Sequence, residues 1–289
     1  YWGGAMNALA GAVVTGAAGK LRRRASATYL TVLVAGVALC AITRPFQGLI
    51  LSLLIGGWLI WRIAGQGWST VRSYLRVSLP ALLLLAASAG SFLYYNYRVT
   101  GKPLTMPYTE GARQYIARRM FVFQDDPPIP EYRHKVLRDI YVGLRRPGLI
   151  AHWRVYGNLK AAARTYLSLP LVPLFMLAIA LALLGRKTRQ RPLVVTAMGG
   201  LAALLTIPWI NAHYYAPFAA ALIIATVASL RFLRAVRYAG GRPFWIVVAA
   251  AVVLLGVRTA EGLAVAAPFR RHAETVWGME RQKIEQRLI

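Results

Sequence analysis

Residues 79–95 read LPALLLLAASAGSFLYY, a stretch that contains no charged side chain. An uninterrupted apolar segment of this length is typical of a helix that crosses a bilayer, whose hydrocarbon core is about 30 Å thick. Similar segments recur along the chain and predict further spans. They are 28–42, 46–63, 167–185, 193–210, 217–233 and 244–257, and the Gly- and Ala-rich segment 1–19 is a less apolar eighth.

The composition supports the same fold class. Of 289 residues, 57% are hydrophobic and only 15% are charged, whereas about 25% are charged in a soluble domain. We therefore predict an all-α integral membrane protein, a polytopic bundle of about eight transmembrane helices with one long helical outer loop. The predicted parts are four helices in 1–97, the outer loop with amphipathic helices in 98–166, four helices in 167–262 and the start of an outer segment in 263–289. Because both ends lie within patterned stretches, we expect a fragment of a longer protein.

The basic residues predict the orientation of these helices. Fifteen lie in four short connections on one face, which contain no acid, while the short connections on the other face carry only Arg44. The positive-inside rule then makes the basic connections cytoplasmic and puts the loop 98–166 outside, in a multi-pass protein of the bacterial inner membrane. The same distribution accounts for much of the net charge of +26 without a nucleic-acid partner.

Acidic and sulfur-containing side chains restrict the chemistry. All nine acids lie in 110–139 and 261–285, outside the confident spans, which argues against a proton relay or cation pump. The single cysteine, Cys40, excludes a disulfide framework or a cysteine zinc site. No nucleotide-binding loop, zinc-protease motif or nucleophile elbow is present.

The outer rim carries the candidate binding residues. Arg44, Arg98 and His213 are expected there, and arginine binds phosphate oxygens through its planar fork of donors. The alternative for Arg44 is that it reaches the lipid headgroups, and for His213 that it belongs to an aromatic belt. Secondary candidates on the same rim are Tyr108, Tyr214 and Lys102.

Asp125 and Asp126 form the second candidate site. Carboxylate oxygens are the ligands that Mg²⁺ or Mn²⁺ prefers, so the pair could hold a divalent metal or contact an acceptor. Adjacent side chains point in different directions on most backbones, and an exposed acidic turn is the alternative.

Several short motifs resemble the GT-C superfamily of polytopic glycosyltransferases, in particular bacterial relatives of the protein O-mannosyltransferase and aminoarabinose-transferase families. The motifs are YWGGA at 1–5, TRPFQG at 43–48, YRVTG at 97–101, PY at 107–108 and HYYAP at 213–217. The resemblance implies that a sugar passes from a polyprenyl-phosphate-linked donor to an acceptor on the outer face. It also implies that an aspartate of the first outer loop, ahead of Tyr1, acts as base beside a metal. Gln47 departs from the family, which has an acid there.

Other functions are open at this point. The span count allows a transporter or lipid flippase, an O-antigen ligase or polymerase acting on the same carrier, or a membrane scaffold. The polar features gather on one face and no internal repeat is evident, whereas transporters usually have repeats and a site at mid-depth. An outward cavity containing Arg44, Arg98 and His213 would favour the transferase.

Overall fold

The computed structural model describes residues 2–115, 119–125, 127–143, 190–207 and 212–235, with short pieces at 175–177, 179–180, 245, 249, 252–253, 256 and 260. Within these residues every regular element is a helix, which confirms the all-helical class for this part of the chain. The helices are α1 (Trp2–Leu21), α2 (Ala27–Thr43), α3 (Pro45–Leu51), η1 (Ser52–Gly56), α4 (Gly57–Ala64), α5 (Trp68–Arg76), α6 (Leu79–Thr100), α7 (Pro107–Tyr115), α8 (Lys135–Gly143), α11 (Arg191–Leu205), η2 (Ala212–Tyr215) and α12 (Ala216–Ala235).

Three helical segments of the described part are long and apolar enough to cross a membrane, namely Pro45–Ala64, Leu79–Thr100 and His213–Phe232. The first combines α3, a π-helical turn (η1) and α4 in one continuous helix. Helices α2 and α11 are apolar but shorter. The predicted spans 167–185 and 244–257 lie almost wholly outside the described residues, so the bundle of eight spans stays a prediction.

Helix α1 lies at the centre of the described helices and packs mainly against α2 and α12. Its small side chains let the neighbouring backbones approach closely. A Cβ atom added to Gly11 would lie 1.9 Å from the carbonyl oxygen of Pro217, at the start of α12. A Cβ atom on Gly36 of α2 would lie 2.8 Å from Cγ2 of Val14. Small residues thus determine how near α2 and α12 lie to α1.

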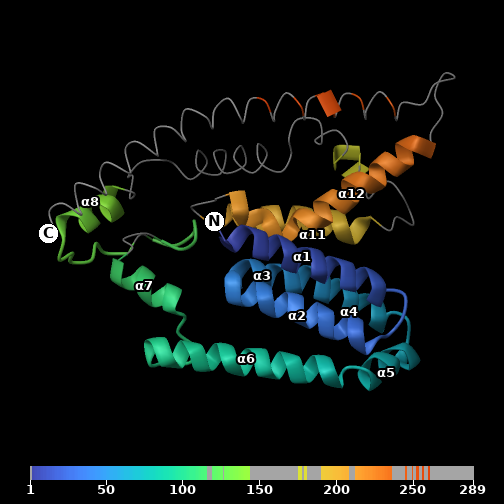
Figure 1. Cartoon of the computed structure of the whole chain (residues 1–289), viewed down its shortest axis with the longest axis horizontal. Helices are drawn as coiled ribbons and strands as arrows, with labels where there is room; N and C mark the ends of the chain where they lie inside the picture. The colour runs from blue at the N-terminus through green and yellow to red at the C-terminus, as the bar shows by residue number, and fades with distance from the viewer. Residues whose placement is uncertain are drawn as a thin grey trace, which may run out of the picture.

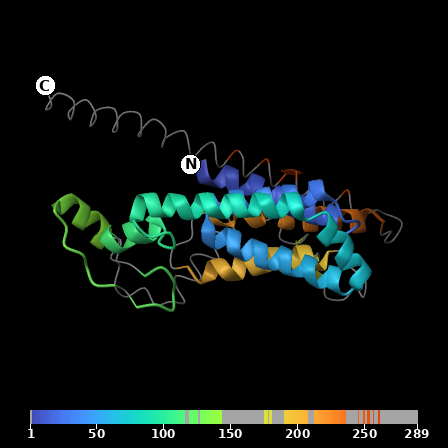
Figure 2. The ribbon, with the colours of Figure 1, turned by 90° about the horizontal axis from the view of Figure 1, so that it is seen from below.

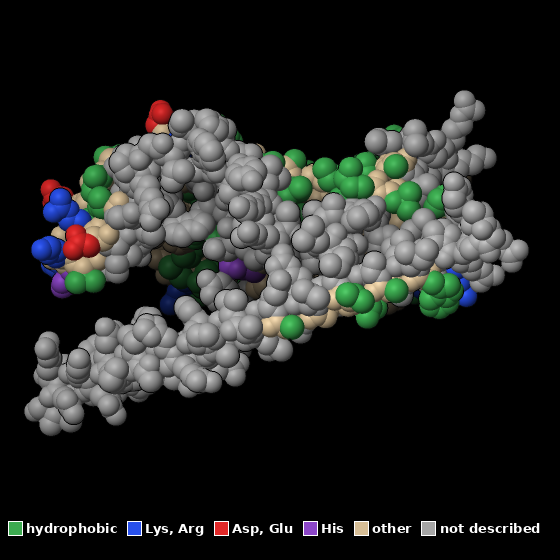
Figure 3. All heavy atoms as spheres, turned by 90° about the horizontal axis from the view of Figure 1, so that it is seen from above, with side chains coloured by type: hydrophobic (Ala, Val, Ile, Leu, Met, Phe, Trp, Pro, Cys, Tyr) green, Lys and Arg blue, Asp and Glu red, His purple; other side chains and the backbone are tan. Residues whose placement is uncertain are grey.

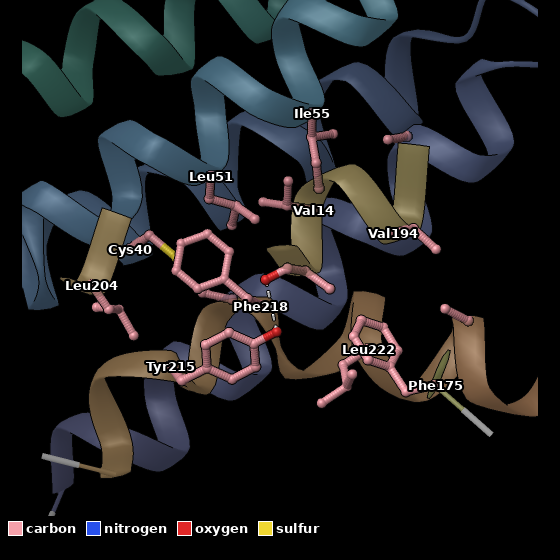
Figure 4. Packing of buried hydrophobic residues seen from close by; sticks show 14 residues of the cluster. Val14, Cys40, Leu51, Ile55, Phe175, Val194, Leu204, Tyr215, Phe218 and Leu222 are labelled. Atoms are coloured by element: carbon pink, nitrogen blue, oxygen red, sulfur yellow. Dashed lines mark hydrogen bonds between the residues drawn. The ribbon is translucent and has the colours of Figure 1, made fainter. Parts of the chain in front are cut away.

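The hydrophobic core is centred on Phe218, whose side chain is fully buried. Figure 4 shows its ring beside Cys40 and Leu51, which come from α2 and α3. The ring also lies against Gly200 of α11, where an added Cβ would be 2.3 Å from Cγ of Phe218. Tyr215 donates a hydrogen bond of 2.9 Å to the carbonyl of Ala197, joining the start of α12 to α11.

The long helices lie side by side, so that their ends form two surfaces (Figures 1 and 2). The rim end comprises the start of α1, the α2–α3 junction, the end of α6, the end of α11 and η2. The opposite end, called the basic end below, comprises the end of α1 with the turn after it, the end of α4, α5, the start of α11 and the end of α12. Its charged residues are Lys20, Arg22, Arg23, Arg24, Arg62, Arg72, Arg76, Arg191, Arg231 and Arg234.

The acids of the described residues all fall within 110–139, and none lies at the basic end. On the face seen in Figure 3, acidic side chains are accordingly visible only toward the left, whereas Lys and Arg are visible at both ends. The structure therefore separates the basic connections from the rim. The orientation of these two ends relative to the cytoplasm stays a prediction.

Candidate anion-binding site

Arg44 stands at a break between two helices. Proline disfavours a helical backbone in the residue before it, and Arg44, which precedes Pro45, has φ −151° and ψ 82°. Its backbone N–H still donates to the carbonyl of Cys40, at 2.7 Å, and its own carbonyl accepts from the N–H of Gly48, at 2.9 Å. Arg44 thus ends α2 and begins α3, and the chain turns sharply around it.

Gly48 makes this turn possible. A Cβ atom at Gly48 would lie 3.0 Å from backbone atoms of Cys40 and Ala41, closer than side chains ordinarily approach. The two helices can therefore leave Arg44 in near contact with each other, which holds the arginine at the rim end. The glycine belongs to the motif at 43–48 on which the family resemblance partly rests.

A polar contact with α1 also fixes the position of this junction. The hydroxyl of Thr43 lies 2.9 Å from Oδ1 of Asn7 and 2.7 Å from the carbonyl oxygen of Leu39. Asn7 is fully buried, and a buried amide is costly unless it is hydrogen-bonded. The end of α2 is therefore tied to the first turns of α1, one residue before Arg44.

His213 reaches the same place from the other side of the bundle. It lies in η2, directly before α12, and a Cβ atom at Gly4 would be 2.9 Å from Cβ of His213. The absence of a side chain at Gly4 therefore leaves room for the histidine against α1. Gly11 does the same for Pro217, four residues further on.

Arg44 and His213 form a direct contact, although they are 169 residues apart in the chain. Arg44 Nη2 lies 2.5 Å from His213 Nε2, and the guanidinium carbon lies 4.2 Å from the centroid of the Tyr214 ring. Because a guanidinium can only donate, Nε2 must accept, which makes the imidazole neutral with its proton on Nδ1. The rings of His213 and Tyr214 meet edge to face, with centroids 4.8 Å apart.

Tyr108, at the start of α7, belongs to the same cluster. Partial burial raises the pKa of its phenol, the neighbouring Tyr214 raises it further, and the charge of Arg44 lowers it. Since Tyr108 is 65% exposed, the shift carries little energy. The phenol remains protonated at neutral pH, so Tyr108 offers a hydrogen-bond donor beside Arg44.

The loop 119–125, in which the sequence singled out only Asp125, borders this cluster. Phe46 meets Phe121 edge to face, with centroids 5.3 Å apart, and Phe121 stacks on Phe123. The loop is held in shape by Oε1 of Gln124, which accepts from the backbone N–H groups of Met120 and Phe121. The alternating aromatics at 121 and 123 were the available signal, but nothing in the sequence indicated their partner.

The same loop is attached to the end of α11. The backbone N–H of Val122 donates a hydrogen bond of 2.8 Å to the carbonyl of Thr206. Arg119 donates to the carbonyls of Val122 and Gln124. The side chains of Phe121 and Phe123 therefore lie on an ordered turn beside Phe46.

The remaining predicted residues lie elsewhere on the rim end. Arg98 contacts Tyr94 of its own helix, with Nη1 3.3 Å from the tyrosine hydroxyl. Lys102 lies near Glu110, whose carboxylate pairs with Arg113 at 3.0 Å. Neither Arg98 nor Lys102 shares a described contact with Arg44.

The described residues do not assemble a metal centre. Asp125 is exposed, and Asp126 lies outside the described residues. Within the part of the chain that the structure describes, no three side chains of His, Cys, Asp or Glu gather. The divalent metal implied by the family resemblance therefore stays a prediction.

The arrangement as a whole suits an anion. Arg44 is half-buried and held by an aromatic face and a neutral imidazole, and among the described residues it pairs with no carboxylate. An arginine fixed in this way keeps most of its N–H groups for a ligand, and guanidinium donors match phosphate oxygens. The part of the chain that the structure describes is thus helical, with three helices able to cross a membrane and the Arg44 cluster at one end. Comparisons with protein-family models, curated proteins and solved structures gave no match.

Proposed function

We propose that the chain belongs to a membrane glycosyltransferase of the GT-C type that takes a sugar from a polyprenyl-phosphate-linked donor and passes it to an acceptor. The observation that carries the proposal is the setting of Arg44, which is bound to His213 and stacked over Tyr214 without a carboxylate partner among the described residues. A cation kept unneutralised at the end of apolar helices fits a phosphate on a lipid carrier.

The chemistry follows from the donor. The acceptor hydroxyl attacks C1 of the sugar and loses its proton to a base, while the bond between C1 and the phosphate oxygen breaks. Negative charge then grows on the departing polyprenyl phosphate, and a fixed cation at that position stabilises the transition state more than the ground state. Arg44 supplies this charge, and the protonated phenol of Tyr108 donates a further hydrogen bond. The family resemblance assigns the base to an aspartate of another outer loop.

The location of the reaction follows from the distribution of charge. If the basic end faces the cytoplasm, as the positive-inside rule predicts, the rim end faces the periplasm of the bacterial inner membrane. The donor's phosphate would then lie at the outer headgroup level and its prenyl chain along the apolar helices.

A transporter or flippase is the main alternative, and three buried hydroxyls of α11 and α12 argue against it, although the buried hydroxyl of Thr15 in α1 has no hydrogen-bond partner in the described part of the chain. Among the described residues, Thr196, Thr226 and Ser229 are buried, and each bonds the carbonyl four residues before it in its own helix. Hydroxyls satisfied in this way do not line a polar path at mid-depth, which a transport pathway requires.

Membranes containing the whole protein, incubated with radiolabelled polyprenyl-phosphate sugars, test the proposal. We expect the label to pass to an acceptor. Substituting Arg44→Gln should weaken donor binding, raising the apparent dissociation constant of the donor by about 10- to 100-fold, because a hydrogen bond to a charged group contributes about 1.5–3 kcal/mol. His213→Gln should also weaken donor binding. The donor affinity of Arg44→Lys should lie between those of Arg44→Gln and the unsubstituted protein, because lysine keeps the charge but loses the planar fork of donors.

The matched control is Arg113→Gln, which removes a cation at the same end that already pairs with Glu110. It should leave donor binding unchanged. Normal turnover by both Arg44→Gln and His213→Gln would rule out the phosphate assignment. Label that crosses the membrane on an intact carrier, without reaching an acceptor, would favour a flippase instead.

A further inference from the structure

Helix α5 leaves its largest apolar side chains exposed on the surface of the protein. Trp68 and Leu75 are 72% and 58% exposed, and they share one face with the exposed Arg72 and Arg76 because positions i, i+4, i+7 and i+8 lie on the same side of a helix. In water alone, Trp68 and Leu75 would be expected on the packed side. A face that combines tryptophan, leucine and arginine is typical of a helix lying at the membrane–water boundary.

The opposite side of α5 is attached to the rest of the protein. The hydroxyl of Tyr74 donates a hydrogen bond to the carbonyl of Leu21, the last residue of α1. Partial burial raises the pKa of Tyr74 and the charge of Arg62 lowers it, so the phenol stays protonated and able to donate. The orientation of α5, with Arg72 and Arg76 exposed, is therefore fixed by its attachment to the end of α1.

This attachment gathers positive charge that no described acid offsets. The turn after Leu21 brings its own basic residues beside α5, and the described acids all lie within 110–139. The resulting basic surface consists of Lys20, Arg23, Arg24, Arg62, Arg72 and Arg76. The positive-inside rule explains why so many cations lie at this end. It does not explain why Trp68 and Leu75 are exposed among them.

We propose that this basic surface binds the headgroups of anionic phospholipids, with Trp68 and Leu75 inserted at the headgroup level and the arginines on the lipid phosphates. The complementary charges and the apolar side chains on the same helix face both point to a lipid surface. The proposal concerns the basic end, opposite to the Arg44 cluster, and does not depend on the proposed function.

Reconstituting the protein into phosphatidylcholine nanodiscs that contain a small fraction of spin-labelled lipid tests this proposal. Electron paramagnetic resonance then measures how strongly the protein immobilises spin-labelled phosphatidylglycerol relative to spin-labelled phosphatidylcholine. We expect the unsubstituted protein to prefer phosphatidylglycerol, and the preference to weaken as salt is raised. Arg72→Gln with Arg76→Gln should lower it by about fivefold for each charge, because a basic residue near an anionic surface contributes about 1 kcal/mol.

Two control variants show whether the preference depends on positive charge as such and on its position at the basic end. Arg72→Lys with Arg76→Lys keeps the charge and should keep the preference. Lys102→Gln with Arg113→Gln removes two charges at the rim end and should also keep it. Should the first glutamine variant fail to fold, Arg23→Gln with Arg24→Gln provides the same charge loss in the exposed turn. The proposal is overturned if the unsubstituted protein shows no preference, if the rim-end variant loses it equally, or if the lysine variant loses it.

Discussion

Gly11 offers the sharpest test of how the helices bring the rim together. The residue is buried in α1, and a Cβ atom there would lie 1.9 Å from the carbonyl oxygen of Pro217 and 2.6 Å from its carbonyl carbon. These are backbone atoms and cannot rotate away. Gly11→Ala therefore requires α1 and the start of α12 to separate, which also moves His213 away from Arg44.

The size of the effect follows from two opposing contributions. Overpacking a well-fitted contact costs about 1–3 kcal/mol, and the upper end applies where backbone opposes the new atom. Replacing glycine by alanine within a helix returns about 1 kcal/mol. We expect a net loss of about 2 kcal/mol in the free energy of unfolding, which corresponds to a fall in Tm of about 4–8 °C for a domain of this size.

Cys40 provides the assay, because it is the single cysteine and is fully buried. A maleimide dye that becomes fluorescent on reacting with thiols reports its exposure during heating in detergent. The matched control is Gly16→Ala in the same helix, where an added Cβ meets nothing within 4 Å and where we expect no loss of stability. Equal Tm values for the two variants would refute the close approach of α1 and α12.

Two further predictions concern polar contacts. Thr43→Val removes the hydroxyl beside the buried Asn7 and should destabilise the protein by about 1–2 kcal/mol in the Cys40 assay. The control is Thr226→Val, which should cost less because the hydroxyl of Thr226 bonds only a carbonyl of its own helix. Equal losses of stability in the two variants would contradict this role of Thr43. Hydrogen bonds from Gln114 and Arg113 lower the pKa of Glu110, so its small stabilising contribution is present above the ordinary pKa and is lost as the pH falls through the lowered value. NMR titration should show that Gln114→Ala raises the pKa of Glu110, and an unchanged pKa would contradict the assigned hydrogen bond.

Much of the helical frame was predictable from the distribution of apolar and charged residues. The segments 28–42, 46–63 and 79–95 correspond to helices in the structure, because a backbone in an apolar environment must satisfy its hydrogen bonds internally. Alternation of the connections also predicted that Arg44 and His213 would lie at the same end. The segments 167–185 and 244–257 stay predictions.

The rotation of each helix about its axis was not predictable in the same way. Arg98 lies at the expected end, yet it contacts Tyr94 and not Arg44. Helix α6 carries large exposed apolar residues, among them Leu82, Leu83 and Leu85, and a helix that is apolar on several sides has no single face that marks the packed one. The sequence therefore predicted at which end of the bundle Arg98 lies, but not to which side of α6 its side chain points.

By itself, the order of residues determined which segments are helices, where they end and which ends collect positive charge, because these properties depend on local composition and on the nearest proline or glycine. Only the tertiary structure decided that Arg44 meets His213 across 169 residues and that Phe46 meets Phe121. Such contacts depend on how closely whole helices approach, and that distance is set by side chains on both partners, as at Gly4 and Gly11. No single segment contains that information.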